Sequence, residues 1–242
     1  MCQCLRCLCS STTMKSLLLI VASCLLSGLA SADEDRQGLI GESLIFSTPS
    51  DTNHVLLTPS RDMDLKNFTL CLRVNTESPR QHVLFSYATQ SSPSELLLKR
   101  EDETTVSLTV SGVKIPFLVR SSQLSSWVHV CARRDMMAKQ VILHINGRPS
   151  VRKALEPSNP IKPGGKVVLG QEQGRVGGGF QQEKCLVGEI ADVHLWDHIL
   201  TTSTIRAISM GDPIYRGNVI DWLTVKHTIK GQVKSLRTTS VN

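Results

Sequence analysis

After Leu29 the 242-residue sequence has no apolar run that approaches the ~20 residues a membrane-spanning helix needs. It also has no strong charge of either sign, because 27 lysines and arginines stand against 21 aspartates and glutamates. Residues 1–32 contain Arg6, Lys15 and no acid, so without them the balance is 25 basic against 21 acidic residues. Such a small, dispersed excess does not form a nucleic-acid-binding stripe. We therefore expect neither a membrane span nor a nucleic-acid partner.

Common catalytic motifs are missing too. There is no Gly-x-Ser-x-Gly elbow for a serine nucleophile and no His-Glu-x-x-His helix for a catalytic zinc. A glycoside hydrolase needs two carboxylates across a cleft, whereas the acidic run from Glu101 to Glu103 is typical of a charged turn. His129 and His144 lie within strand patterns, where packing or surface roles are the simpler interpretation. The sequence therefore predicts a binding protein and not an enzyme.

The N-terminal segment is typical of a secretory leader. An apolar run from Leu17 to Leu29 follows Lys15 and precedes the small residues Ala30-Ser31-Ala32, the pattern that signal peptidase cleaves. We predict a signal peptide over residues 1–32, a mature chain from residue 33 onward, and secretion to an extracellular location.

Four further cysteines lie upstream of this leader, at Cys2, Cys4, Cys7 and Cys9. Such a group would suit a metal cluster, but it precedes Met14, which is a natural start residue. A true start at Met14, or else an extended signal, explains these cysteines more simply than a metal site does.

Three cysteines remain in the mature chain. Cys71 and Cys131 lie in apolar segments with strand character, and we predict a disulfide between them. A bridge that closes a loop of about 60 residues stabilises a fold by roughly 4 kcal/mol in the chain-entropy estimate. Cys185 is the odd residue, and either a buried free thiol or an interchain bridge would account for it.

Alternating apolar and polar residues dominate the mature chain. Residues 106–111 and 141–145 both alternate, as half-buried antiparallel strands do. Asn146-Gly147 follows directly and predicts a type I′ hairpin, whose second strand would occupy residues 148–155. Further strands are predicted at Ser43–Phe46, Phe68–Val74, His82–Tyr87, Glu95–Lys99, Trp127–Cys131, Lys166–Leu169, Glu189–Trp196 and Lys226–Val233.

One short helix is predicted near residues 201–210. Thr201 can cap its N-terminus, and Gly211 with Pro213 ends it. Many short strands and a single helix favour an all-β fold, a two-sheet antiparallel jelly-roll sandwich. Because there is no internal repeat and no low-complexity linker, we predict one domain over residues 33–242.

Several segments share an order and spacing with one known family. They are Asn67-Phe68-Thr69-Leu70-Cys71, Leu84-Phe85-Ser86-Tyr87-Ala88-Thr89, Val128-His129-Val130-Cys131, Leu169-Gly170-Gln171-Glu172-Gln173, Leu186-Val187-Gly188-Glu189-Ile190, Leu195-Trp196-Asp197 and Asn218-Val219-Ile220-Asp221-Trp222. From about Ser43 to Val233 the chain resembles a pentraxin of the short C-reactive protein and serum amyloid P type. It departs from the family signature after Cys131, where Arg134 replaces a tryptophan. The resemblance implies a jelly roll with a helix on one face, a ring of five subunits, and two calcium ions that bridge to phosphate or carbohydrate ligands.

The resemblance also places the calcium ligands on this chain. The family's Asp-Asn pair, Glu-Gln-Asp run and later Glu and Gln fall at Pro93-Ser94, Glu172-Gln173-Gly174, Gln181 and Lys184. Residual metal ligands are therefore Ser94, Glu172, Gln173 and Gln181, of which only Glu172 is negative. Two calcium ions bring four positive charges, which one carboxylate does not balance. We predict that calcium, the implied cofactor, binds weakly or not at all, unless Glu183 shifts into the site.

Basic residues fall at or beside the same ligand face. The family's phosphocholine pocket aligns with Lys99 and Lys114, whose ammonium groups repel a quaternary ammonium, so we do not expect phosphocholine binding. One hypothesis is that Lys184 pairs with Glu172 in place of the metal, while Lys99, Arg100 and Lys114 contact an anionic ligand. The alternative is that all four basic residues are ordinary solvated surface groups.

The resemblance implies a secreted, oligomeric pattern-recognition protein of innate immunity. It would bind anionic or carbohydrate groups on microbial or damaged-cell surfaces. The alternative is a scaffold or decoy subunit without a ligand site, which acts through partner proteins such as complement components. Asn67-Phe68-Thr69 is in addition an N-glycosylation sequon, so Asn67 is the predicted glycan site.

Overall fold

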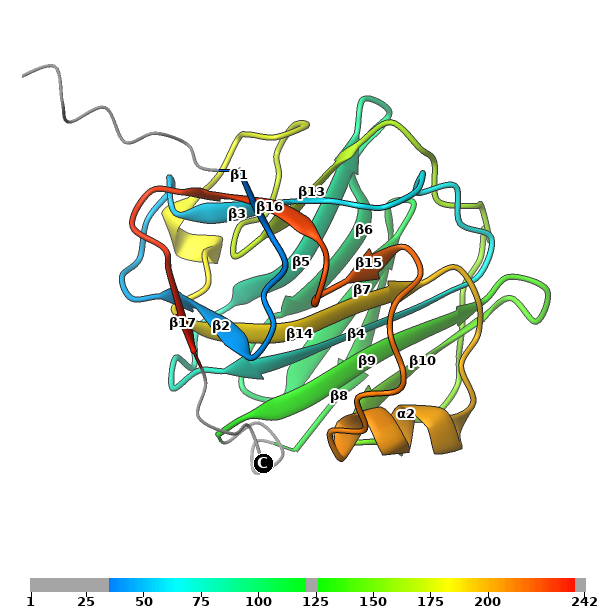
Figure 1. Cartoon of the computed structure of the whole chain (residues 1–242). Helices are drawn as coiled ribbons and strands as arrows, with labels where there is room; N and C mark the ends of the chain where they lie inside the picture. Colours follow the sequence, from blue (N-terminus) through cyan, green and yellow to red (C-terminus); the bar gives the residue numbers. More distant parts are fainter. Residues whose placement is uncertain (1–34, 121–125, 238–242) are drawn as a thin grey trace, which may run out of the picture. The chain divides into compact units, whose positions relative to one another are not determined.

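The computed structural model describes residues 35–120 and 126–237 (Figure 1). These residues form two antiparallel β-sheets with one α-helix, as the sequence predicted. The predicted signal peptide, the alternative start at Met14 and the four upstream cysteines lie outside the described residues. Within the described ranges, no helix combines the length and the hydropathy that crossing a bilayer requires.

The first sheet, called sheet A, has eight strands in the order β1-β16-β3-β13-β5-β6-β7-β8. Strand β13 thus lies between β3 and β5, which are far from it in sequence. The loop that follows β13 therefore lies at one end of these two neighbouring strands. In spatial order the strands are β1 (Asp35–Gln37), β16 (Lys226–Lys230), β3 (His54–Thr58), β13 (Lys166–Leu169), β5 (His82–Thr89), β6 (Ser92–Arg100), β7 (Thr105–Val110) and β8 (Val113–Leu118).

The second sheet, called sheet B, has nine strands, seven of them in the order β11-β10-β9-β4-β14-β2-β17. Two short strands pair beside this path, β12 with β10 and β15 with β14. The bounds are β11 (Arg148–Pro149), β10 (Gln140–Ile145), β9 (Val128–Asp135), β4 (Phe68–Asn75), β14 (Gly188–Trp196), β2 (Glu42–Phe46), β17 (Lys234–Arg237), β12 (Lys153–Ala154) and β15 (Ile220–Asp221).

The apolar core lies between the two sheets. In β4 the side chains of Leu70, Leu72 and Val74 belong to this core, because alternate residues of a strand face the same way. The residues between them face the outer side of sheet B, yet they are also buried, since other parts of the chain cover that side. This double burial explains why β4 reads as a nearly continuous apolar run.

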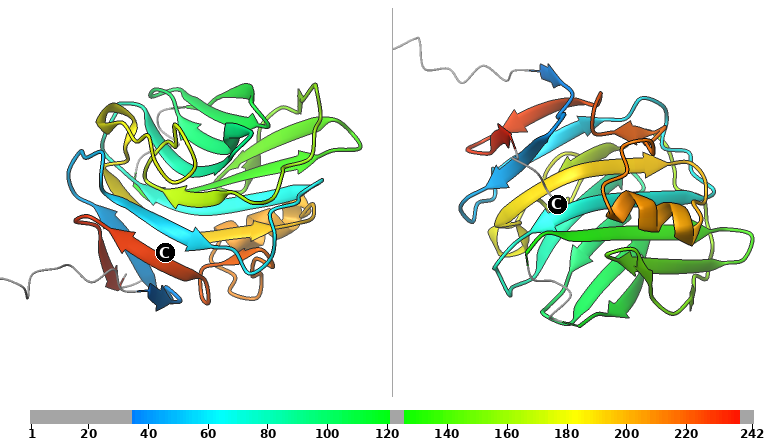
Figure 2. Two further views of the ribbon diagram at one scale, coloured as in Figure 1. Left: turned by 90° about the horizontal axis from the view of Figure 1, so that it is seen from above. Right: turned by 60° about the horizontal axis from the view of Figure 1, so that its bottom comes forward.

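The predicted disulfide between Cys71 and Cys131 is present and covalently links the neighbouring strands β4 and β9. The two cysteines are directly opposite each other in the strand register and lie on the outer face of sheet B. Helix α2 (Thr202–Ser209) lies against one face of sheet B (Figure 2). Its side chains Ile205 and Ile208 form a buried cluster with the two cysteines. Its N-cap is Thr201, whose side chain accepts a hydrogen bond from the Thr204 amide, as predicted.

Two strand predictions need correction at glycine turns. The strand predicted over residues 226–233 ends early, at Lys230, because Gly231, with φ at 72°, turns the chain from β16 in sheet A toward β17 in sheet B, which begins only at Lys234. Strand β7 ends at Val110, because Ser111 and Gly112 adopt φ values of 48° and 81° and start a turn to β8. Strand β8 was not predicted from the sequence.

The hairpin at Asn146-Gly147 is confirmed, with positive φ angles of 50° and 74° at these two residues. Its second strand is shorter than predicted and breaks into β11 and β12. Pro149 has no amide proton for the ladder, and the Ser150 hydroxyl accepts a hydrogen bond from the Leu143 amide in place of a backbone carbonyl.

Candidate functional site

The loop after β13 is anchored by two buried glutamines. The side-chain amide of Gln171 donates to the carbonyls of Ser50 and Asn53, at 2.6 and 3.1 Å. That of Gln173 donates to the carbonyls of Ser86 and Lys166, at 3.0 and 2.9 Å. Glu172 lies between these anchors, and its side chain is 18% exposed. The backbone that carries Glu172 is therefore fixed from both sides.

The Glu172 carboxylate lies between two ammonium groups. Lys99 Nζ, from β6, is 3.0 Å from Oε2, and Lys184 Nζ is 3.0 Å from Oε1. Lys184 is the last residue of the short 3₁₀-helix η3 (Gln182–Lys184). The pairing of Lys184 with Glu172, which was one of the two hypotheses drawn from the sequence, is thus present, and Lys99 contacts the same carboxylate.

These contacts continue to a second carboxylate, that of Glu101. Lys99 Nζ is 3.8 Å from Glu101 Oε2, and Lys114 Nζ of β8 is 2.7 Å from Oε1. Burial alone would raise the pKa of Glu101, but its contacts with Lys114, Ser107 and Lys99 outweigh burial, and the pKa is lowered. We call Lys184, Glu172, Lys99, Glu101 and Lys114 the lysine–glutamate row.

The other predicted ligand residues lie outside this row. Arg100 neighbours Lys99 on β6 and donates from Nε to the Asp102 carbonyl at 3.0 Å, and adjacent strand residues face opposite sides. Ser94 lies near the start of β6, where its carbonyl accepts from the Gly112 amide at 3.2 Å. Gln181 and Glu183 are exposed at η3.

The donor set in this loop does not fit a calcium ion. Both carboxylate oxygens of Glu172 contact ammonium groups, and Gln173 Oε1 accepts from the Gly177 amide at 2.7 Å. A Cβ atom at Gly174, where the resemblance places an aspartate, would lie 2.9 Å from the Gly179 carbonyl oxygen. Calcium needs six to eight oxygen ligands, so the loop would have to rearrange to supply them.

Cys185 is a buried thiol, 2% exposed, directly after η3. Its Sγ accepts from the Ser50 amide at 3.3 Å and from Arg80 Nη2 at 3.2 Å. Arg80 also donates to the carbonyls of Gln182 and Cys185, which ties η3 to the segment before β5. Of the two interpretations left open by the sequence, this burial favours the free thiol.

We predict that Cys185 forms no bridge between chains. Non-reducing electrophoresis should give a single monomeric band, because the sulfur is covered by Arg80 and Ser50. A thiol reagent should label this cysteine only after denaturation, and the Cys185→Ser variant should migrate identically. A dimeric band that disappears in Cys185→Ser would show that the thiol is exposed and bridged.

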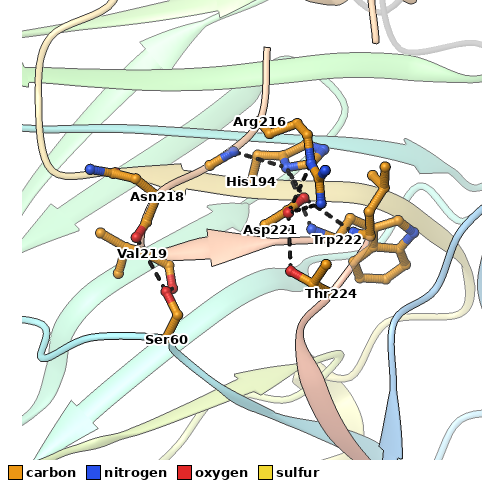
Figure 3. Close-up of polar contacts among 10 residues, drawn as sticks. Ser60, His194, Arg216, Asn218, Val219, Asp221, Trp222 and Thr224 are labelled. Atoms are coloured by element: carbon orange, nitrogen blue, oxygen red, sulfur yellow. Dashed lines mark hydrogen bonds and ion pairs between the residues drawn. The ribbon is translucent and has the colours of Figure 1, made fainter. Parts of the chain in front are cut away.

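A second polar cluster holds the segment around β15 against β14 (Figure 3). His194 Nδ1 accepts from the Gly217 and Trp222 amides at 3.3 and 3.4 Å. Asp221 pairs with Arg216 and accepts from the Thr224 hydroxyl, and these contacts lower its pKa although burial alone would raise it. The sequence did not indicate this cluster, because its residues meet only through the β14–β15 pairing. It anchors the segment around β15 to β14.

The predicted glycan site lies directly before β4. Asn67 is half-buried, and its Oδ1 accepts from the Met136 amide at 2.9 Å. Thr69 of the same sequon is buried and donates to the His198 carbonyl at 2.9 Å. Attachment of a glycan at Asn67 stays a prediction, and the buried hydroxyl implies that it would precede the folding of β4.

Two antiparallel sheets with one helix on an outer face define an all-β jelly-roll sandwich, and comparison with known proteins gives the family. The Pentaxin family model matches residues 42–236. The chain is 33% identical over 218 residues to the C-reactive protein of Sus scrofa, which covers 90% of this chain and 95% of that protein. It is 34% identical over 189 residues to the serum amyloid P-component of Mus musculus, with coverage of 78% and 84%.

Among solved structures, the native heptameric SAP-like pentraxin from Limulus polyphemus has the same fold. Its TM-score is 0.73 at 24% sequence identity, and the match covers 82% of this chain and 95% of that one. The chain therefore belongs to the Pentaxin family, as its motifs predicted.

Proposed function

We propose that this protein is a secreted, oligomeric pentraxin that binds oxyanionic groups on microbial or damaged-cell surfaces without calcium. The lysine–glutamate row carries this proposal. It has three ammonium groups and only two carboxylates, so it keeps a net positive charge. The two outer lysines are the accessible ones, with Lys114 55% and Lys184 30% exposed. An anion is therefore the ligand that this surface favours.

The cellular setting and assembly are supported by other features. A disulfide such as Cys71–Cys131 persists in oxidising, extracellular environments. One relative is named as a serum component and another as a heptamer. A ring of this chain, with five or another number of subunits, would present several rows at once, and such multivalency raises affinity for a surface. Complement components remain candidate partners of the ring.

We expect the purified protein to show no micromolar affinity for calcium. Calorimetric titration should give no binding heat, and the melting temperature should be the same with calcium and with chelator, because Lys184 already neutralises Glu172. A bound ion would instead stabilise the folded state by mass action. A calcium-dependent rise in melting temperature would contradict the proposal.

The proposed lysines can be tested on immobilised heparin in the presence of chelator. Lys114→Glu combined with Lys184→Glu should abolish retention, because it reverses two accessible charges of the row. Lys66→Glu is the matched control for each charge reversal, since Lys66 is exposed and lies outside the row. Retention should also fall steeply with salt, as expected for an exposed ionic contact.

Failure of the wild-type protein to bind any anionic surface would favour the scaffold alternative. One observation supports that alternative specifically. Every lysine of the row already contacts a carboxylate of the same chain, which leaves no unpaired ammonium group in the row for an external anion. In that case the ring would act only through partner proteins.

A further inference from the structure

The Glu172 carboxylate occupies the position that a ligand anion would need. Each of its oxygens accepts from a different ammonium group, Lys99 Nζ and Lys184 Nζ, both at 3.0 Å. Two ammonium groups that donate to one carboxylate in this way can bind other oxyanions as well, because charge-assisted hydrogen bonds of this kind also hold sulfate and phosphate. In the structure this site is occupied by the carboxylate of Glu172.

Lys99 is accessible to an external anion only at the expense of Glu172. The Lys99 side chain is 9% exposed, and its ammonium group contacts Glu172 on one side and Glu101 on the other. Lys184 is 30% exposed but shares the same carboxylate. A ligand that uses both lysines must therefore take the place of the Glu172 carboxylate.

Glu172 can leave without unfolding of the loop. Its backbone is fixed by the buried side chains of Gln171 and Gln173, which make their own hydrogen bonds to Ser50 and Ser86. Only the rotatable side chain of Glu172 has to swing into solvent, where its carboxylate is hydrated. Glu101, 3.8 Å from Lys99, remains to compensate this buried ammonium group.

We propose that Glu172 is an internal competitor, which an oxyanion of the ligand displaces to bind between Lys99 and Lys184. The ligand class is an acidic glycan whose sulfate or carboxylate group enters this position. This inference rests on the proposed function for the location of the ligand, and it adds that the free site is autoinhibited. Weak anions then fail to bind, whereas a multivalent acidic surface displaces several copies of Glu172 at once.

The test compares three single variants with the wild-type protein by calorimetric titration in chelator. Glu172→Gln removes the competing charge and keeps the shape, and it should bind a heparin oligosaccharide about tenfold more tightly, because one hydrogen bond between charged groups no longer has to be broken. Glu183→Gln is the matched control, because Glu183 is exposed on the neighbouring η3 and changes the net charge equally. Its affinity should change by less than about twofold.

The Glu172→Asp variant distinguishes the effect of displacing the carboxylate from the effect of changing the net charge. It also replaces Glu172→Gln in the test if that variant does not fold. Aspartate keeps the charge but is one methylene shorter, so it bridges Lys99 and Lys184 poorly. Displacement predicts tighter heparin binding by this variant, whereas a pure charge effect predicts wild-type affinity. Polysialic acid, which carries carboxylates only, tests whether sulfate is required.

The outcomes distinguish this inference from the proposed function. If wild type binds heparin and both Glu172 variants bind with unchanged or lower affinity, the competitor role is wrong and the proposed function stands. If wild type does not bind but Glu172→Gln does, the competitor role stands and wild type is a closed subunit. If none of the folded proteins binds either polyanion, both proposals are wrong.

Discussion

Lowering the pH from about 7 to about 5 should reduce the free energy of unfolding by roughly 5 kcal/mol. Three buried histidines cause this effect, and all are less than 2% exposed. Their pKa values are lowered from 6.5 to about 4 for His82, about 3 for His129 and about 4 for His144. Burial is the main cause for each, and nearby arginines oppose protonation further.

The free energy of unfolding falls at lower pH because the unfolded chain binds more protons than the folded protein does. The unfolded chain protonates its histidines near pH 6.5, while the folded protein keeps these three neutral until the pH falls toward 4 or 3. Stability is therefore complete above pH 6.5 and is lost progressively below it. Carboxyl groups with lowered pKa, such as Glu101, add their own losses only below the ordinary value of 4.5. The window between about pH 5 and about pH 7 thus reports on histidines.

Urea unfolding at a series of pH values measures this loss. His144→Leu should remove about a third of it, because both ring nitrogens of His144 are buried without a hydrogen-bond partner among the described residues. Gln182→Leu is the control for introducing a leucine, since Gln182 is exposed and its side chain carries no titratable group, so the pH dependence should stay as in the wild type. A stability that is flat over this window would show that these histidines are hydrated or paired in the folded protein.

The second large effect is expected for Arg134→Leu, which should destabilise the fold by about 3–5 kcal/mol. Arg134 is fully buried on the inner face of β9, opposite Phe68. Its guanidinium donates to the carbonyls of Leu65 and Asn159 and to the Ser158 hydroxyl. Leucine fills part of the volume but removes the donor to the Asn159 carbonyl and the Ser158 hydroxyl, while the Leu65 carbonyl keeps the Ile161 amide. It also removes a cation that interacts with the buried Glu95.

Arg133→Leu is the matched control for this prediction. Arg133 is the adjacent residue on β9 and is only half-buried, and within the described residues its side chain makes one hydrogen bond, to the Leu200 carbonyl at 3.0 Å. Its loss should cost about 1 kcal/mol in the same urea experiment. Equal effects of the two substitutions would mean that the interior contacts of Arg134 contribute no more than a surface hydrogen bond.

Local sequence signals predicted the elements whose partners are nearby or whose pattern is strong. The Thr201 cap, the Asn146-Gly147 turn and the alternation in β7 and β10 each depend on a few consecutive residues. The Cys71–Cys131 bridge, between residues 60 apart, was also predictable, because these are the two of the three mature cysteines that lie in apolar segments with strand character.

The remaining features depend on which strands become neighbours. Lys99 and Glu172 are 73 residues apart and meet only because β13 pairs with β5, which in turn pairs with β6. The sequence therefore suggested a surface role for Lys99, which is in fact buried. Arg134 shows the same limit, since an arginine in a strand pattern does not reveal that loop carbonyls will surround it.

The cation that neutralises Glu172 is part of the same polypeptide. A free ion exchanges with the medium and leaves on dilution, whereas a tethered group has an effective concentration fixed by the chain that carries it. We therefore expect the loop to adopt its shape as soon as the chain folds, whatever ions surround it. A chelating resin should therefore leave the conformation of this loop unchanged. In a mixed preparation, the same resin should alter the loop of any related protein that depends on a bound metal ion.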